Sequence, residues 1–82
     1  MLDKRSLLSA NYLFRDLDQQ LIDQLTQLAV TRRLGSGEVL FFKGDEGDAL
    51  YGILDGRVRI STTAPNGKEV VLSMMERGDV FG

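Results

Sequence analysis

An acidic cluster near the middle of the chain has the residue types of a cation site. Asp45, Glu46 and Asp48 alternate with Gly44 and Gly47. Carboxylate oxygens bind Ca²⁺, but a calcium loop of the EF-hand type needs a longer fixed pattern of oxygen ligands that ends in a bidentate glutamate. This pattern is absent, so we interpret the cluster as a solvated turn and predict no metal site.

Two hydroxyl side chains, those of Thr62 and Ser73, are candidate nucleophiles. Such a hydroxyl needs an activating base, and the sequence contains no histidine. Lys43 or Lys68 would have to replace it, but both fall in predicted turns, where lysine is normally solvated. The lack of histidine also argues against a metal-dependent cupin, and the lack of cysteine excludes disulfides and iron–sulfur clusters. We therefore predict no catalytic residue.

The glycine-containing segment 78–82 is a third candidate, because glycine allows the backbone to approach a ligand closely. Backbone amides of a glycine-rich loop bind phosphate in the P-loop and in the dinucleotide-binding fingerprint, but neither pattern is present here. From these residues alone, a plain corner between two strands is the favoured interpretation.

The charge balance excludes two classes of partner for this chain. Ten basic and twelve acidic residues give a net charge of −2, which argues against a nucleic-acid or anionic membrane surface. No window approaches the roughly 18 consecutive apolar residues of a membrane span, and the N-terminus lacks the apolar run of a signal peptide. We expect a cytoplasmic protein with no membrane partner and no DNA-binding residues in this chain.

Two helices are expected within about residues 4–29. Asp3 is a candidate cap for the first helix, and Asn11 near its end suits a left-handed exit. Asp18 is a candidate cap for the second helix. The apolar residues of this helix recur with helical period, at Leu21, Ile22, Leu25, Leu28 and Ala29. Its other face is rich in glutamine, so we expect the apolar stripe to pack on the protein's own sheet.

Short strands are expected over about residues 30–82, because all nine glycines lie from Gly35 onward and separate short apolar runs. The expected strands cover residues 29–34, 39–42, 50–54, 57–61 and 69–75. Asp55 and Gly56 are predicted to reverse the chain tightly, and Asn66 and Gly67 to form the tip of a hairpin.

Alternation along residues 57–61 predicts which strand face is buried. Val58 and Ile60 are expected to point inward, while Arg57 and Arg59 stay in solvent. Arg32 and Arg33 are likewise interpreted as solvated. Gly52 interrupts an apolar run, which indicates a bulge or a close approach of another segment.

The glycine-centred motifs together resemble the cyclic-nucleotide-binding domain, and most of all that of Crp/Fnr-type bacterial transcriptional regulators. The motifs are Gly35 with Gly37, and residues 39–45, 47–51, 53–58, 67–69 and 78–82. The resemblance implies an α+β fold in which N-terminal helices precede a partial antiparallel β-roll, a double-stranded β-helix of the jelly-roll type. Residues 1–82 would then be the N-terminal part of an effector domain. The closing strands, the dimerisation helix and the DNA-binding domain are expected to be absent from this chain.

The resemblance also implies a ligand site. In the family, Phe81 and Gly82 open the phosphate-binding cassette, whose glutamate and arginine would follow Gly82. Ile60, Leu72 and Ser73 would line the interior of the roll, with the first two against the base or ribose. The implied ligand of the parent protein is cAMP or another cyclic nucleotide, with no cofactor in this chain itself. The implied parent is a homodimer that binds DNA through a C-terminal helix-turn-helix.

Other functions share this domain. The domain could instead regulate an attached kinase or channel, and residues beyond 82 would distinguish that case from a transcription factor. It could also be a degenerate interaction module that binds no nucleotide, which an intact phosphate cassette would oppose. An enzyme ranks last.

Overall fold

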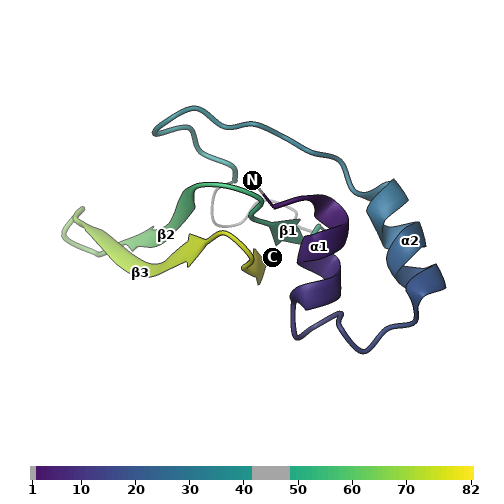
Figure 1. Ribbon diagram of the computed structural model, residues 1–82. Helices are drawn as coiled ribbons and strands as arrows, with labels where there is room; N and C mark the ends of the chain where they lie inside the picture. Colours follow the sequence, from purple (N-terminus) through teal and green to yellow (C-terminus); the bar gives the residue numbers. More distant parts are fainter. Residues whose placement is uncertain (1, 42–48) are drawn as a thin grey trace.

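The computed structural model describes residues 2–41 and 49–82, which form two helices followed by four strands (Figure 1). The elements are α1 (Lys4–Ala10), α2 (Gln19–Leu28), β1 (Tyr51–Gly52), β2 (Arg57–Thr63), β3 (Glu69–Glu76) and β4 (Val80–Phe81). Helices therefore precede antiparallel strands, and the predicted α+β class is confirmed. The acidic cluster of Asp45, Glu46 and Asp48, and the turn expected at 43–45, lie outside the described residues. Within the described part, neither helix has the length and apolar character needed to cross a bilayer.

Helix α1 begins at the predicted cap. The Asp3 carboxylate accepts a hydrogen bond from the Ser6 backbone N–H at 2.7 Å, and this bond lowers the pKa of Asp3. The predicted left-handed exit at Asn11 is wrong, because its backbone is extended (φ −70°, ψ 134°). Asn11 instead turns the chain with its side chain, whose Oδ1 accepts a hydrogen bond from the Leu13 N–H at 2.9 Å.

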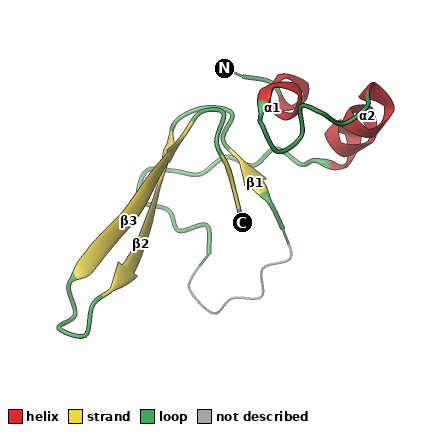
Figure 2. Ribbon diagram, turned by 90° about the horizontal axis from the view of Figure 1, so that it is seen from below, coloured by secondary structure: helices red, strands yellow, loops and turns green. Residues whose placement is uncertain are grey.

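Helix α2 also begins as predicted, with the Asp18 carboxylate accepting a hydrogen bond from the Leu21 N–H at 2.8 Å. Helix α2, however, lies against α1 and not on the sheet (Figure 2). Ile22 is almost fully buried at 1% exposure, whereas Leu28 is 77% exposed. The stripe is therefore covered only in part.

Two cationic side chains of α1 also contact α2 and the residue after it. Arg5 pairs with Asp23 and donates a hydrogen bond to Gln19 Oε1 at 2.7 Å. Lys4 Nζ donates to the Ala29 carbonyl at 2.8 Å, where the C-terminus of α2 carries partial negative charge. These contacts join the polar edges of the two helices.

The segment between α2 and β1 differs from the prediction. Residues 29–41 contain no strand, so the strand expected at 29–34 is wrong, as is the described part of the one expected at 39–42. Phe42 itself lies outside the described residues. A strand needs a neighbour for its backbone hydrogen bonds, and no described strand lies alongside this segment. Val30 is consequently 88% exposed.

The four strands form one two-stranded ribbon with a corner in it. Strand β1 pairs antiparallel with β4, and β2 pairs antiparallel with β3. Ile53 joins the two sections, because its N–H donates to Asp79 O at 3.0 Å and its carbonyl accepts from the Gly78 N–H at 2.8 Å. The β2–β3 section extends away from the helices (Figure 2).

One predicted hairpin is confirmed and one predicted reversal is wrong. Gly67 has φ +83° at the tip between β2 and β3, as the Asn66 and Gly67 pair predicts. Gly56 also has positive φ, at +87°, but Asp55 and Gly56 do not fold β1 back on β2. They form the corner at which β1 continues into β2, because each strand is already paired with a different partner.

The exposure pattern along β2 follows the predicted alternation. Val58 and Ile60 are half-buried, while Arg57 and Arg59 are exposed. The register shifts once, because Ile60 faces Ser73 whereas Ser61 faces Val71. Leu72 is thereby left without a partner as the extra residue of a β-bulge in β3.

The buried core of the described residues is small and consists of Leu7, Ile22, Ile53 and Phe81. Gly52 lets α1 approach β1, because a Cβ atom there would lie 3.0 Å from Leu7 Cδ1. The close approach predicted for Gly52 is confirmed.

We expect the 82-residue chain by itself to self-associate in solution. Five large apolar side chains are each more than 60% exposed, namely Tyr12, Leu28, Val30, Leu50 and Leu72. A domain of this size buries only about 60% of its unfolded surface and is marginally stable, and exposed apolar residues beside unpaired strand edges favour association. Light scattering coupled to gel filtration should give a mass above that of the monomer at micromolar concentration. A monodisperse monomer that melts cooperatively would contradict this expectation.

Candidate functional site

Three of the five predicted ligand-binding residues come together on the β2–β3 section. Ile60 and Ser73 are direct partners in the register, so their side chains share one face of the ribbon. Leu72 lies next to Ser73 at the bulge and is 63% exposed. The face that carries Ile60 and Ser73 thus offers an apolar side chain beside a hydroxyl group, the chemistry that a nucleoside base and ribose can use.

Phe81 lies on β4, in the other section of the ribbon, and its ring is part of the core. It is 8% exposed, and its ring centroid lies 5.6 Å from that of Tyr51 and 6.5 Å from that of Phe41. The Tyr51 and Phe41 rings stack on each other at 5.6 Å. These three residues are called the aromatic cluster below, and they fix β4 to β1.

Gly82 follows β4 directly and packs against another stretch of backbone. A Cβ atom at Gly82 would lie 2.7 Å from the Ala49 carbonyl oxygen and 3.3 Å from Leu50 Cα. Both atoms belong to the main chain, so rotation of a side chain cannot relieve the overlap. The structure therefore gives Gly82 a packing reason to be glycine.

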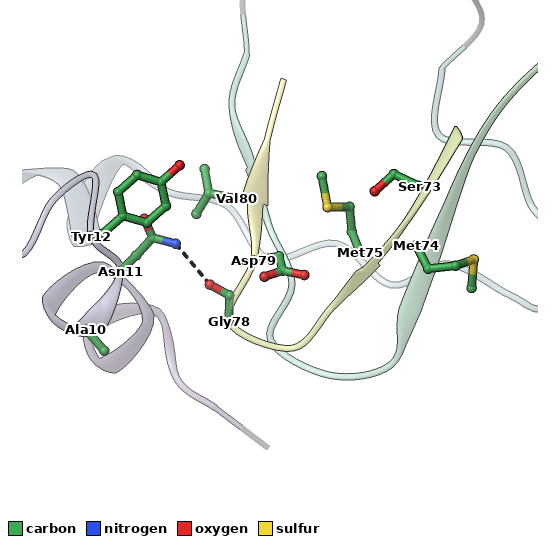
Figure 3. A pocket seen from close by; sticks show the side chains of 9 residues that line it. All are labelled: Ala10, Asn11, Tyr12, Ser73, Met74, Met75, Gly78, Asp79 and Val80. Atoms are coloured by element: carbon green, nitrogen blue, oxygen red, sulfur yellow. Dashed lines mark hydrogen bonds between the residues drawn. The ribbon is translucent and has the colours of Figure 1, made fainter. Parts of the chain in front are cut away.

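An open groove of about 590 Å³ lies between the end of α1 and the β3–β4 turn (Figure 3). It is lined by Ala10, Asn11, Tyr12, Ser73, Met74, Met75, Gly78, Asp79 and Val80. Of the predicted site residues it contains Ser73 alone. Its lining includes one carboxylate and no basic side chain, so it has no counter-charge for a phosphate. The Asp79 carboxylate is already engaged, since its Oδ2 accepts a hydrogen bond from the Glu76 N–H at 2.7 Å.

The described ribbon also lacks a cation on its inward face. Arg57 and Arg59 point outward, and Arg59 Nε lies 3.2 Å from Glu69 Oε1 in an exposed ion pair. Exposed pairs of this kind contribute roughly 0–1 kcal/mol to stability. The described residues can therefore contact an uncharged base or ribose, but they supply no partner for a phosphate.

Asn11 is the site residue that sequence reasoning missed. Its Nδ2 donates a hydrogen bond to the Gly78 carbonyl at 3.0 Å across the groove (Figure 3). The sequence offered a signal only for the local role of Asn11, since a small amide at a helix end is a common turn residue. Nothing in the spacing indicated a partner 67 positions away.

Residues 31–82 match the family model of the cyclic nucleotide-binding domain. The chain belongs to this family, and its domain is of the Crp/Fnr type. It is 34% identical over 70 residues to a CRP-like cAMP-activated global transcriptional regulator of Mycobacterium tuberculosis, a match that covers 85% of the chain and 31% of the regulator. It is 33% identical over 70 residues to the cyclic AMP receptor protein of Thermus thermophilus, which covers 85% of the chain and 32% of that protein.

Other relatives carry the domain in a different setting. Over 50 residues the chain is 38% identical to lysophospholipase NTE1 of Phaeosphaeria nodorum, a match that covers 61% of the chain and 3% of that protein. No solved structure matches the chain significantly. The chain spans about a third of the length of the two regulators.

The matches to the two kinds of relative differ in length. A match over 70 of 82 residues leaves 12 outside it, so it includes α2 wherever it begins. The 50-residue match to the lysophospholipase is short enough to fall entirely after α2. The chain is therefore similar to the regulators through α2 as well as its ribbon.

Proposed function

We propose that this chain is the N-terminal part of the effector domain of a Crp/Fnr-type transcription regulator. The observation that carries the proposal is the 34% identity to the cAMP-activated regulator of Mycobacterium tuberculosis over 70 residues that include α2. By the name of that relative, the effector of the parent protein is cAMP or another cyclic nucleotide.

In the proposed effector site, different residues would contact different parts of the ligand. Ile60 and Leu72 would contact the base or ribose, and the Ser73 hydroxyl would donate or accept a hydrogen bond. A cyclic phosphate carries a negative charge that needs a cationic partner. The described inward face has none, so the phosphate would be bound by the cassette that Phe81 and Gly82 open, with its arginine supplied by the parent protein.

The same reasoning extends to the rest of the parent. Further strands would close the ribbon into a jelly-roll and cover its exposed apolar residues. A dimerisation helix and a helix-turn-helix would bind a second subunit and promoter DNA. The effector would shift an equilibrium between dimer conformations through its different affinities for the two states. Such a regulator acts in the cytoplasm, where the chromosome lies.

Calorimetric titration of the full-length parent protein with cAMP and with cGMP tests the proposal. We expect saturable binding of at least one of these nucleotides. We also expect the 82-residue chain alone to bind neither, because the described face has no partner for the phosphate. Lack of binding to the full-length protein would favour a degenerate interaction module instead.

A pair of serine variants locates the ligand in the same experiment. Ser73→Ala should weaken binding by about fivefold, the effect of losing one hydrogen bond of roughly 1 kcal/mol. Ser61→Ala makes the same chemical change on the exposed, outward side of β2 and should leave the affinity unchanged. Equal affinities of the two variants would place the ligand elsewhere.

A further inference from the structure

The Asn11 side chain joins the helical part of the chain to the strands. Its Oδ1 accepts a hydrogen bond from the Leu13 N–H at 2.9 Å, and its Nδ2 donates to Gly78 O at 3.0 Å. Asn11 is half-buried. Among the side-chain hydrogen bonds of the described residues, the bond to Gly78 is the one that connects a helix end to the ribbon. The amide thus uses its acceptor within the helical region and its donor toward the ribbon.

The partner of Asn11 lies in a turn that leads directly into β4. Gly78 has φ +93°, a conformation that favours glycine. The turn is held on one side by Ile53, which bonds to Gly78 N and to Asp79 O. The Gly78 carbonyl is left for Asn11 on the other side. Only Asp79 separates this carbonyl from β4, which Gly82 follows.

The segment that contains α1 also contacts the ribbon at two other points. Leu7 lies against Gly52 of β1, and the Leu2 N–H donates to Leu54 O at 3.1 Å. These two contacts fix α1 to the β1 side. The Asn11 bond adds the β4 side, so the position of α1 determines where the turn at Gly78 is held.

We infer that Asn11 is a positioning residue for effector binding. Through its bond to Gly78 it holds β4 and Gly82 in place, so that effector affinity depends on how α1 packs against the ribbon. This inference rests on the proposed function, because β4 matters to the ligand only if the phosphate cassette follows it. Without Asn11, the Gly78 carbonyl would still accept a hydrogen bond from water. The main effect of the Asn11 bond is therefore to fix the position of the turn at Gly78.

The test uses Asn11→Asp in the full-length parent protein. The introduced carboxylate keeps the acceptor for Leu13 N–H but has no donor for Gly78 O. Asn66→Asp is the matched control, because Asn66 Oδ1 accepts from the Lys68 N–H in the same kind of turn, at the hairpin tip. Asn11→Ser separates geometry from charge, since its neutral hydroxyl can bond Leu13 but is too short to reach Gly78.

We expect Asn11→Asp and Asn11→Ser to bind cyclic nucleotide about five- to tenfold more weakly, and Asn66→Asp to bind as the wild type does. Hydrogen exchange at the Gly78 and Ile53 amides should become faster in both Asn11 variants. Exchange at Ile22, whose amide bonds Asp18 O inside α2, should not change. A general loss of stability would instead speed exchange at all three amides.

The outcomes distinguish the inference from the function on which it rests. Unchanged affinity and unchanged exchange in the Asn11 variants would overturn the inference, as would equal weakening in Asn66→Asp. If the wild type binds no cyclic nucleotide, the proposed function fails. The coupling to affinity then fails with it, while exchange at Gly78 and Ile53 still decides whether Asn11 holds the turn.

Discussion

Replacement of Phe81 by alanine is expected to lower the free energy of unfolding by about 3–5 kcal/mol, the usual cost of removing a buried aromatic side chain. Phe81 is one of four buried residues in the described part of the chain, and its ring contacts both other rings of the aromatic cluster. Its removal leaves a cavity and breaks the contact that holds β4 to β1. Urea unfolding of the full-length parent, followed by circular dichroism, measures the loss.

Phe41→Ala is the matched control for this prediction. Phe41 belongs to the same aromatic cluster but is 45% exposed, so its removal creates no closed cavity. We expect a loss of about 1–2 kcal/mol, in proportion to the apolar area that Phe41 buries. Equal losses in the two variants would contradict the deeper burial of Phe81.

The helices were predictable because their signals are local. Asp3 and Asp18 each precede a helix and bond a backbone N–H three residues on, as short-range capping requires. The partner of α2 was not predictable in the same way. An apolar stripe indicates that a helix must be covered, but it does not say by which element, and here α1 covers α2 and adds polar contacts from Arg5 and Lys4.

The strands show the same division between local and distant causes. Gly56 and Gly67 both adopt the positive φ that their turn sequences predict. Whether such a turn closes a hairpin depends on which strands pair, and β1 pairs with β4, which lies almost 30 residues further along the chain. Residues 29–34 have strand composition but no strand, because composition supplies no hydrogen-bond partner.

In the candidate site, only the relations that follow from strand alternation and hairpin register were predictable from the sequence. Ile60 and Ser73 face each other because both lie on the hairpin that Asn66 and Gly67 predict. The bulge at Leu72 and the Asn11 bond to Gly78 have no local signal, since each depends on how distant segments meet. The family resemblance supplied the residues of the site, and the structure supplied their spatial relation.

Gly82→Ala is expected to weaken effector binding by at least about tenfold and to cost about 1–3 kcal/mol of stability, as overpacking typically does. The new methyl group would lie 2.7 Å from the Ala49 carbonyl oxygen. Real Cβ atoms do not approach so closely, and both Ala49 O and Leu50 Cα are main-chain atoms. The backbone at β4 or at residues 49–50 must therefore move, which would displace the start of the proposed phosphate cassette. Titration and urea unfolding of the full-length parent measure both effects.

Gly35→Ala makes the same chemical change where there is room for it. The nearest atom to a Cβ at Gly35 is Glu38 Oε1 at 4.0 Å, the end of a flexible side chain. Gly35 does not have the positive φ that would penalise alanine. Because alanine restricts the unfolded chain, this variant should be unchanged or more stable by about 0.4–1 kcal/mol. Opposite signs at the two glycines would show that glycine is required at position 82 by its contact with the backbone at 49–50. A neutral Gly82→Ala would contradict this packing reason for glycine.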